Sequence, residues 1–154
     1  MEIAIIAHDG KRELMAQFCI AYYNTLVKHN LYAPAATASY VGDAAGITIE
    51  SLLNADFGGE DQIAARVSYN EVDCLLYFRD ADGLYGDEHG LLRLCDARSI
   101  PVATNIASAE IIVRAIEAGD LDWRNYINPK TNRKKPRRIE PNKKGRKRIN
   151  DTKT

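Results

Sequence analysis

The sequence has few of the residues that build disulfide frameworks, metal sites or membrane spans. Only three cysteines occur in 154 residues, and all lie inside apolar patterns without metal-ligand spacing. We interpret Cys19, Cys74 and Cys95 as small buried side chains in a reducing compartment. An unpaired thiol nucleophile is the less favoured alternative, because no histidine lies near any of them in the sequence. No apolar run approaches the roughly 20 residues of a transmembrane helix. The chain enters a strand pattern directly, so we expect no signal peptide, no membrane contact and a cytoplasmic location.

The net charge of zero conceals a strong division of charge along the chain. Residues 130–154 contain twelve Lys or Arg and two acidic residues, a charge of +10. Residues 1–129 contain nine Lys or Arg and nineteen acidic residues, a charge of −10. A segment with so few apolar residues cannot bury enough surface to offset the entropy of ordering it. We therefore expect one folded domain over 1–129 and a basic, disordered tail over 130–154. The tail either contacts nucleic acid non-specifically or is a solvated segment that offsets the acidic body.

Strand and helix patterns alternate along the folded part. Apolar segments predict strands at 2–7, 31–33, 47–49, 72–78 and 100–103. Between and after the strands, the patterns predict helices at 13–28, 40–45, 63–69, 91–97 and 107–118, with a loop of small residues at 35–39. Strands that alternate with helices form right-handed crossovers in a parallel sheet. The predicted fold is a Rossmann- or flavodoxin-like α/β protein, a three-layer αβα sandwich with a five-stranded parallel sheet.

Polar side chains follow the first strand at the point where it ends. His8 and Asp9 come directly after the strand, and Lys11 and Arg12 precede the next helix. Ligands of open α/β sheets bind at the carboxyl ends of strands, where helix N-termini offer free N–H groups to anions. An ordinary turn with Asp9 as a helix cap is the alternative, but it gives no reason for His8. We therefore favour a site at this turn.

Two further segments place acidic residues at comparable positions. Asp80 follows the strand at 72–78, so it also lies at a carboxyl end. The glycine-rich turn at 58–59 precedes Glu60 and Asp61, and glycines allow a backbone to approach a ligand closely. Simple capping of the following helix by these two acids is a fair alternative. We expect the side chains of His8, Glu60 and Asp80 to point into one cleft.

Several short motifs with their spacing resemble the methylglyoxal synthase family over roughly residues 1–129. They are Ala7-His8-Asp9, Gly58-Gly59 followed by an acid, Tyr77-Phe78-Arg79-Asp80, Leu91-Leu92-Arg93-Leu94 and Ile100-Pro101-Val102-Ala103-Thr104-Asn105. The resemblance implies a homohexameric lyase that converts dihydroxyacetone phosphate to methylglyoxal and inorganic phosphate. It also implies that neither a metal nor an organic cofactor takes part.

The resemblance assigns roles to individual residues. Glu60 aligns with the catalytic aspartate of the family, and His89 is the nearby substitute for its catalytic histidine, whose aligned position is Asp87. The implied catalytic residues are Glu60, Asp61, His89, Asp80 and Asp9. The implied residues for substrate and phosphate binding are His8, Lys11, Arg12, Thr37, Asn54, Ala55 and Gly59.

The chain departs from the family pattern where phosphate is expected to bind. Pro34-Ala35-Ala36-Thr37-Ala38 replaces the Thr-Gly-Thr-Thr-Gly phosphate loop, and Asn54-Ala55 replaces a Ser-Gly pair. Proline has no N–H group, and alanine restricts the backbone more than glycine does. We therefore expect a weakened phosphate site. The alternative is a catalytically impaired family member that serves as a ligand-binding or assembly module with a nucleic-acid-binding tail.

Overall fold

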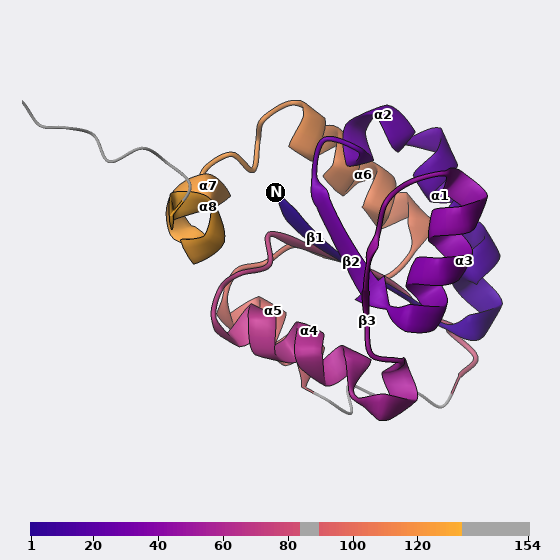
Figure 1. Ribbon diagram of the computed structural model, residues 1–154. Helices are drawn as coiled ribbons and strands as arrows, with labels where there is room; N and C mark the ends of the chain where they lie inside the picture. Colours follow the sequence, from indigo (N-terminus) through magenta and orange to yellow (C-terminus); the bar gives the residue numbers. More distant parts are fainter. Residues whose placement is uncertain (84–89, 134–154) are drawn as a thin grey trace, which may run out of the picture.

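The computed structural model describes residues 1–83 and 90–133. In this part of the chain, five strands form one sheet in which all neighbours run parallel, in the order β3-β2-β1-β4-β5 (Figure 1). The strands are β1 (Glu2–Ala7), β2 (Asn30–Pro34), β3 (Glu50–Leu52), β4 (Cys74–Phe78) and β5 (Val102–Ala103). The predicted five-stranded parallel sheet is confirmed.

Helices cover both faces of the sheet and make it the middle of three layers. One face carries α1 (Arg12–Ala21), α3 (Ala35–Ala45) and α6 (Ile106–Glu117), with α2 (Tyr23–Leu26) next to α6 (Figure 1). The other face carries α4 (Gly59–Ser68) and α5 (Leu91–Ala97) (Figure 1). Two short 3-10 turns, η1 (Asp9–Lys11) and η2 (Ala55–Phe57), precede α1 and α4. The predicted αβα sandwich is therefore confirmed.

The central strand β1 divides the core into two clusters. All six of its residues are buried, as expected for a strand between two helical layers. Because side chains alternate across a strand, Ile3 and Ile5 pack with α1, α3 and α6, whereas Ala4 and Ile6 pack with α4 and α5. The same alternation determines the face of the sheet on which each side chain at the carboxyl end of a strand lies.

The prediction of one continuous helix at 13–28 is wrong. The segment consists of α1, which begins at Arg12 and ends at Ala21, and of the short α2. Tyr22 separates them with φ −107° and ψ 24°, outside helical geometry. Its aromatic ring packs against Phe18 at 5.0 Å between ring centroids, the i,i+4 contact of a helical turn, so the break begins only after this contact. Apolar periodicity alone does not report such a break.

The loop predicted at 35–39 is also wrong, because α3 begins directly at Ala35. Pro34 ends β2 and stands at the N-cap of α3, where its missing N–H group removes no helical hydrogen bond. Alanine has the highest helix propensity, so the small residues read as a loop are good helix formers. Gly46 closes the helix with φ 63°, in the left-handed region that favours glycine.

The edge strand β3 lies three residues later than predicted. Ile47 is buried against the core beneath α3 instead of in the sheet, and the pairing with β2 joins Tyr32 with Glu50 and Pro34 with Leu52. The apolar residues of this segment therefore pack below the sheet edge. Smaller differences affect α4, which begins at Gly59 instead of Ile63, and β4 and β5, which begin at Cys74 and Val102.

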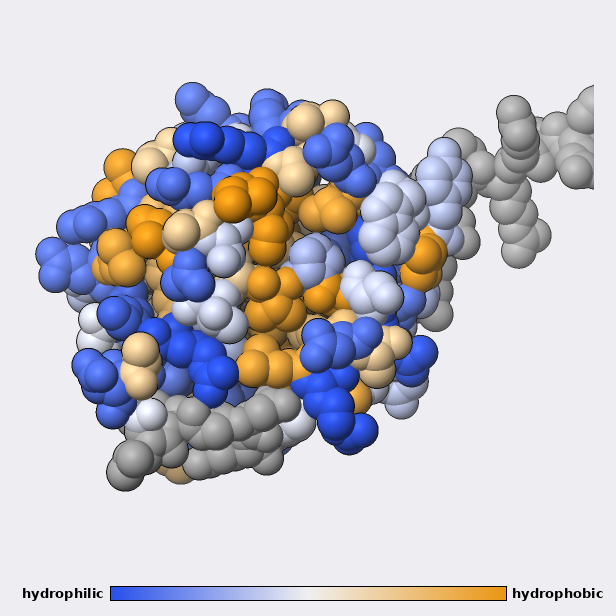
Figure 2. Space-filling model, turned by 180° about the vertical axis from the view of Figure 1, so that it is seen from behind, coloured by the Kyte–Doolittle hydropathy of each residue, from blue (hydrophilic) through white to orange (hydrophobic). Residues whose placement is uncertain are grey.

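The face on the β5 side of the molecule is partly apolar. Figure 2 views the molecule from behind, where β5 forms the sheet edge opposite β3, and apolar side chains gather over the middle of that face. Contiguous exposed apolar area of this kind is typical of interaction surfaces. Among the described residues, no helix is long and apolar enough to cross a membrane.

Two short helices, α7 (Arg124–Ile127) and α8 (Pro129–Arg133), follow α6. The helix α8 crosses the domain boundary predicted after residue 129, so residues 130–133 of the predicted disordered tail are helical. The predicted tail beyond Arg133 lies outside the described residues, so its disorder stays a prediction.

A buried ion pair anchors these C-terminal helices to the amino edge of the sheet. The Arg124 Nε donates to Asp73 Oδ1 at 3.2 Å, and both side chains are 0% exposed. Asp73 also accepts hydrogen bonds from the backbone N–H of Glu2 at 2.8 Å and from Asn128 Nδ2 at 3.0 Å. The Arg124 Nη2 donates to the carbonyl of Val72 at 2.6 Å. The Asp73 carboxylate, directly before β4, therefore joins Glu2 at the start of β1 to Arg124 and Asn128 in the C-terminal segment.

We expect Arg124→Met to lower the free energy of unfolding by about 3–5 kcal/mol, because it leaves the Asp73 carboxylate buried without its cation. Chemical denaturation at neutral pH measures this loss. The matched control is Arg114→Met on the exposed side of α6, for which we expect a change within about 0.5 kcal/mol. A loss below about 1 kcal/mol for Arg124→Met would contradict the anchoring role.

Candidate functional site

The carboxyl edge of the sheet gathers side chains from the ends of β1 and β4. These strands are paired in register, with Ile6 opposite Tyr77 and Ala7 opposite Phe78. The pairing continues past the strand ends, where the N–H of His8 donates to the carbonyl of Phe78 at 3.1 Å. His8 is therefore held by backbone hydrogen bonding beside the end of β4.

The imidazole of His8 is fixed at both ring nitrogens. The backbone N–H of Asp80 donates to His8 Nδ1 at 2.9 Å, so this nitrogen carries a lone pair and not a proton. His8 Nε2 lies 3.4 Å from the Tyr77 hydroxyl, and the two rings meet edge to face at 5.5 Å. The neutral ring consequently bears its proton on Nε2, directed at the Tyr77 oxygen.

The electrostatic surroundings keep His8 neutral. Burial lowers the pKa of His8 most strongly, the Glu60 carboxylate opposes this, and Arg79 adds to the lowering. The carboxylates of Asp80 and Asp9 also raise the pKa but do not reverse the direction. The net pKa lies below the usual 6.5 of histidine, so the imidazole is uncharged at pH 7. This agrees with the acceptor role of Nδ1, because protonation of Nδ1 would break its hydrogen bond.

Glu60 joins the same cluster from the first turn of α4. The Tyr77 hydroxyl donates to Glu60 Oε1 at 3.5 Å, so the phenol connects the carboxylate with His8. Asp61 follows in the helix and is exposed. Successive helical residues are rotated by about 100°, so the two neighbouring carboxylates take different directions. Of the two acids, Glu60 is the one hydrogen-bonded to Tyr77.

The turn before Glu60 leaves no room for a side chain at Gly59. A Cβ atom there would lie 2.0 Å from the carbonyl oxygen of Leu53. Gly58 has φ 102°, a backbone conformation that other residues rarely adopt. The backbone carbonyl of Asn54 accepts from the N–H of Gly59 at 3.0 Å, and Gln62 Oε1 accepts from the N–H of Leu53 at 2.8 Å. This packing sets where α4 begins and therefore where Glu60 lies.

The remaining predicted residues of the first turn and of β4 lie at the same edge but make different contacts. Asp80 reaches His8 through its backbone, while its carboxylate accepts from the N–H of Asp82 at 3.0 Å. Asp9 pairs with Arg12 at 2.8 Å, and its side chain is 92% exposed. An ion pair so open to solvent stabilises the fold little. Lys11 lies in η1, half-buried, beside this pair.

Two of the predicted phosphate-binding residues, Thr37 and Asn54, lie at the N-terminus of α3. Thr37 is buried in the first turn of this helix. The N–H of Ala36 donates to Asn54 Oδ1 at 3.1 Å, and the N–H of Ala35 donates to the carbonyl of Leu53 at 3.3 Å. Two of the amides that a helix N-terminus offers to an anion are therefore already engaged by protein oxygens. Ala55, in the exposed η2 turn, adds no hydroxyl.

His89 and its aligned neighbour Asp87 fall in the segment 84–89, which lies outside the described residues. Their predicted roles stay predictions. The three cysteines are free and buried. Burial raises the pKa of Cys19 and Cys74 to about 12, so these thiols are not ionised at neutral pH and are poor nucleophiles. The described residues contain no group of three or more His, Cys, Asp or Glu that could hold a metal ion.

Tyr77 was missed by the sequence analysis, although it lies between His8 and Glu60. Its signal in the sequence is its place in an apolar strand that ends one residue later. That pattern assigns Tyr77 to the core, where it is 6% exposed. Only the register with β1 places its hydroxyl beside His8.

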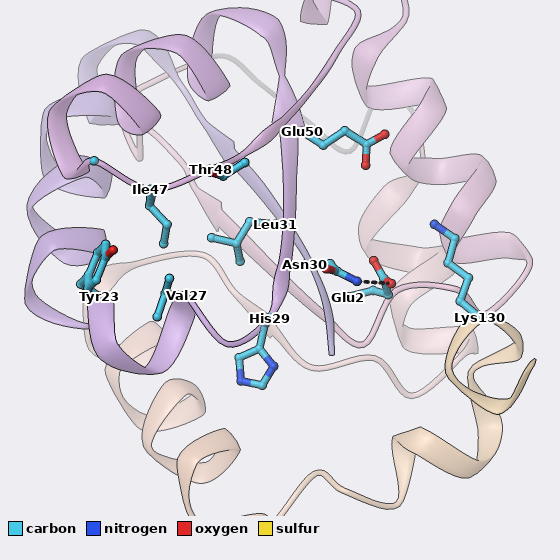
Figure 3. A pocket seen from close by; sticks show the side chains of 11 residues that line it. Glu2, Tyr23, Val27, His29, Asn30, Leu31, Ile47, Thr48, Glu50 and Lys130 are labelled. Atoms are coloured by element: carbon cyan, nitrogen blue, oxygen red, sulfur yellow. Dashed lines mark hydrogen bonds between the residues drawn. The ribbon is translucent and has the colours of Figure 1, made fainter. Parts of the chain in front are cut away.

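A separate cavity of about 740 Å³ opens at the opposite edge of the sheet. It is lined at the amino ends of the strands by Glu2, Asn30 and Glu50, and on its apolar side by Val27 and Leu31 (Figure 3). Several polar side chains here are already paired. Asn30 Nδ2 donates to Glu2 Oε1 at 2.9 Å, and His29 Nδ1 lies 3.0 Å from the N-terminal amine. The cavity therefore shares no residue with the His8–Glu60 cluster.

Fold and cluster together define a class of protein. An α/β protein with a carboxylate, a phenol and a neutral imidazole at the carboxyl edge of its parallel sheet has the groups for proton transfer beside a carbonyl.

Comparisons with known proteins found methylglyoxal synthases both by sequence and by structure. No model of a known protein family matches the chain. Methylglyoxal synthase of Caldicellulosiruptor saccharolyticus is 45% identical over 138 residues, covering 88% of this chain and 98% of that protein. Methylglyoxal synthase of Listeria welshimeri is 44% identical over 128 residues, covering 81% of this chain and 96% of that protein. The crystal structure of methylglyoxal synthase from Elizabethkingia anophelis aligns with a TM-score of 0.69 at 25% identity, over 73% of this chain and 76% of that chain. The chain belongs to the methylglyoxal synthase family.

We expect Gly59→Ala to destabilise the protein by about 1–3 kcal/mol, because the added methyl group forces the start of α4 away from the Leu53 carbonyl. Thermal and chemical denaturation measure the loss. Gly10→Ala is the matched control, since a Cβ atom there meets nothing within 4 Å. Equal stability of the two variants would show that the turn yields without cost and does not fix Glu60.

Proposed function

We propose that this chain is a carbon–oxygen lyase that converts dihydroxyacetone phosphate to methylglyoxal and inorganic phosphate. The observation that carries the proposal is the hydrogen-bonded series of Glu60, Tyr77 and His8 at the carboxyl edge of the sheet. Membership of the methylglyoxal synthase family supports this reaction over other proton transfers beside a carbonyl.

The reaction assigns Glu60 the role of general base. Its carboxylate removes a proton from the hydroxymethyl carbon next to the carbonyl, and the electron pair of the broken C–H bond forms an enediolate. The enediolate then expels phosphate as the C–O bond on the other side of the carbonyl breaks. The enol that remains takes up a proton at its methylene carbon, loses its hydroxyl proton and thereby becomes methylglyoxal. A neutral imidazole is the appropriate electrophile for a carbonyl oxygen in such a reaction. We keep the predicted His89 in this role, because the Nε2 proton of His8 is directed at Tyr77.

We propose that phosphate is held at the edge where η1 and the N-terminus of α3 meet the sheet. Lys11, Arg12 and Thr37 supply two cations and a hydroxyl there. The site is weakened, because Asn54 Oδ1 and the Leu53 carbonyl accept hydrogen bonds from the first two N–H groups of α3. Each of these two hydrogen bonds would have to break before its N–H group could bind phosphate. This supports a low affinity for the phosphate group in addition to the changes in the loop sequence.

Assembly and location complete the proposal. We infer that the chain forms a homohexamer in the cytoplasm. The apolar face on the β5 side supports an interface between copies (Figure 2). The three free, buried cysteines are consistent with a reducing compartment.

The test of the reaction is release of inorganic phosphate and methylglyoxal from dihydroxyacetone phosphate by the purified chain. We expect slow turnover by the wild type and a loss of about 10²–10⁴-fold in kcat for Glu60→Gln, which removes the base and keeps the side-chain shape. Glu117→Gln, at an exposed glutamate near the end of α6, is the matched control and retains wild-type activity. The lyase function would be refuted if the wild type formed no methylglyoxal at any substrate concentration tested.

Asn54→Ser tests the weakened phosphate site. The shorter side chain withdraws the oxygen that accepts from the Ala36 N–H, which then becomes available to an anion. A hydrogen bond to a charged group contributes about 1.5–3 kcal/mol, so inorganic phosphate should inhibit the variant about 10- to 100-fold more strongly.

Asn105→Ser provides the matched control for this measurement, because Asn105 Oδ1 accepts from the N–H of Ser108 at the N-terminus of α6, beyond the opposite edge strand. We expect phosphate inhibition of the control to remain as in the wild type. Unchanged inhibition of Asn54→Ser would place phosphate away from α3.

The alternative function, a catalytically impaired module with a nucleic-acid-binding tail, depends on residues beyond Arg133. These residues lie outside the described part of the chain, so this function stays a prediction. The phosphate-release assay separates the two functions, since only the lyase produces methylglyoxal.

A further inference from the structure

Tyr77 occupies the centre of the cluster without an assigned role. It is the only side chain that the described hydrogen bonds connect to both His8 and Glu60, at 3.4 Å and 3.5 Å. Its ring is held in the core between β1 and the helices α4 and α5, and it is 6% exposed. A phenol so placed has one hydrogen to donate and lone pairs to accept. The partners on its two sides decide in which direction its proton points.

The direction of the proton follows from the backbone. The N–H of Asp80 occupies His8 Nδ1, so the ring presents N–H at Nε2 and donates to the Tyr77 oxygen. The phenol oxygen therefore accepts from the imidazole and directs its own hydrogen at Glu60 Oε1. The order of donation runs from Asp80 through His8 and Tyr77 to Glu60. Each group in the series is fixed by the one before it.

We propose that Tyr77 is a positioning residue that orients the Glu60 carboxylate for proton abstraction. This inference rests on the proposed lyase function and adds a residue to it. Tyr77 donates to Oε1 and thereby limits the rotation of the carboxylate.

The need for such a group follows from the identity of the base. Glutamate has one more methylene than aspartate, which moves the carboxylate by about 1 Å and adds a rotatable bond, and a misplacement of that size can cost about 100-fold in rate. A hydrogen bond from the buried phenol of Tyr77 on β4 restricts rotation about this additional bond of Glu60. The charged and titratable groups around the cluster are His8, Asp9, Arg79, Asp80 and, on the same helix, Asp61.

The experiment compares Tyr77→Phe with the wild type in the dihydroxyacetone phosphate assay. The variant keeps the ring and its edge-to-face contact with His8 and loses only the hydroxyl. We expect kcat to fall about 10- to 100-fold, while KM changes less than about 3-fold, because positioning of the base acts on the chemical step.

Tyr32→Phe is the matched control. Tyr32 is a buried tyrosine on β2 that faces the same side of the sheet, and its ring lies 4.5 Å from the guanidinium of Arg66. Both variants remove one phenolic hydroxyl from the same core cluster. We expect the control to keep kcat within about 3-fold of the wild type, so a general effect of removing a buried hydroxyl is separated from the effect on Glu60.

A double-mutant cycle with Glu60→Asp distinguishes positioning from a structural role. The shorter carboxylate no longer reaches the Tyr77 hydroxyl, so Tyr77→Phe should cost less than about 3-fold in the Glu60→Asp background. An equal loss in both backgrounds would show that Tyr77 does not act through Glu60 and would overturn the inference.

Imidazole nitrogen NMR of the wild type and of Tyr77→Phe provides a readout that does not require activity. We expect His8 in the wild type to be neutral, with its proton on Nε2, and this proton to exchange faster with solvent in Tyr77→Phe. A wild-type proton on Nδ1 would overturn the order of donation. An inactive wild type would refute the lyase itself, whereas an active wild type with an equally active Tyr77→Phe would refute only the role of Tyr77.

Discussion

The parallel pairing of β1 with β4 is the constraint on which the candidate site depends. The register that places Ile6 opposite Tyr77 continues through the bond from the His8 N–H to the Phe78 carbonyl and through the bond from the Asp80 N–H to His8 Nδ1. These backbone bonds select the tautomer of the imidazole. A shift of one residue would turn Tyr77 to the opposite face of the sheet and separate it from Glu60.

The two sides of the carboxyl edge differ in how far they retain what the reaction requires. On the β1–β4 side, an imidazole, a phenol and a carboxylate form one connected series. On the α3 side, the Asn54 side chain and the Leu53 carbonyl occupy amides that would otherwise face an anion. On one side three polar groups are thus hydrogen-bonded to one another, whereas on the other side a phosphate bound as we propose would have to compete with the protein for N–H donors. This contrast supports the proposed lyase with a weakened phosphate site.

The polar cluster at the amino edge of the sheet is a fully buried ion pair. There Asp73 and Arg124 are fully buried and are bonded to the backbone of Glu2 and Val72, so they hold the C-terminal helices against the strand starts. The Asp73 carboxylate accepts from three donors, and Arg124 donates through Nε and Nη2, whereas its buried Nη1 has no hydrogen-bond partner among the described residues. At the carboxyl edge, hydrogen bonds instead link His8, Tyr77 and Glu60. The buried pair thus stabilises the amino edge, and the proposed chemistry lies at the carboxyl edge, where open α/β sheets bind ligands.

The sequence by itself determined the layered α/β fold, because strand and helix patterns alternate and β1 and β4 are continuous apolar runs. It also placed His8, Glu60 and Asp80 at the ends of elements, which is where a parallel sheet binds ligands. It could not determine that Ala35–Ala38 form the first turn of α3, because small residues suit a loop as well as a helix. Nor could it reveal that Tyr77 joins His8 to Glu60 or that Asn54 caps α3. Those contacts depend on strand register and on where a helix begins, and both are set by packing between residues far apart in the chain.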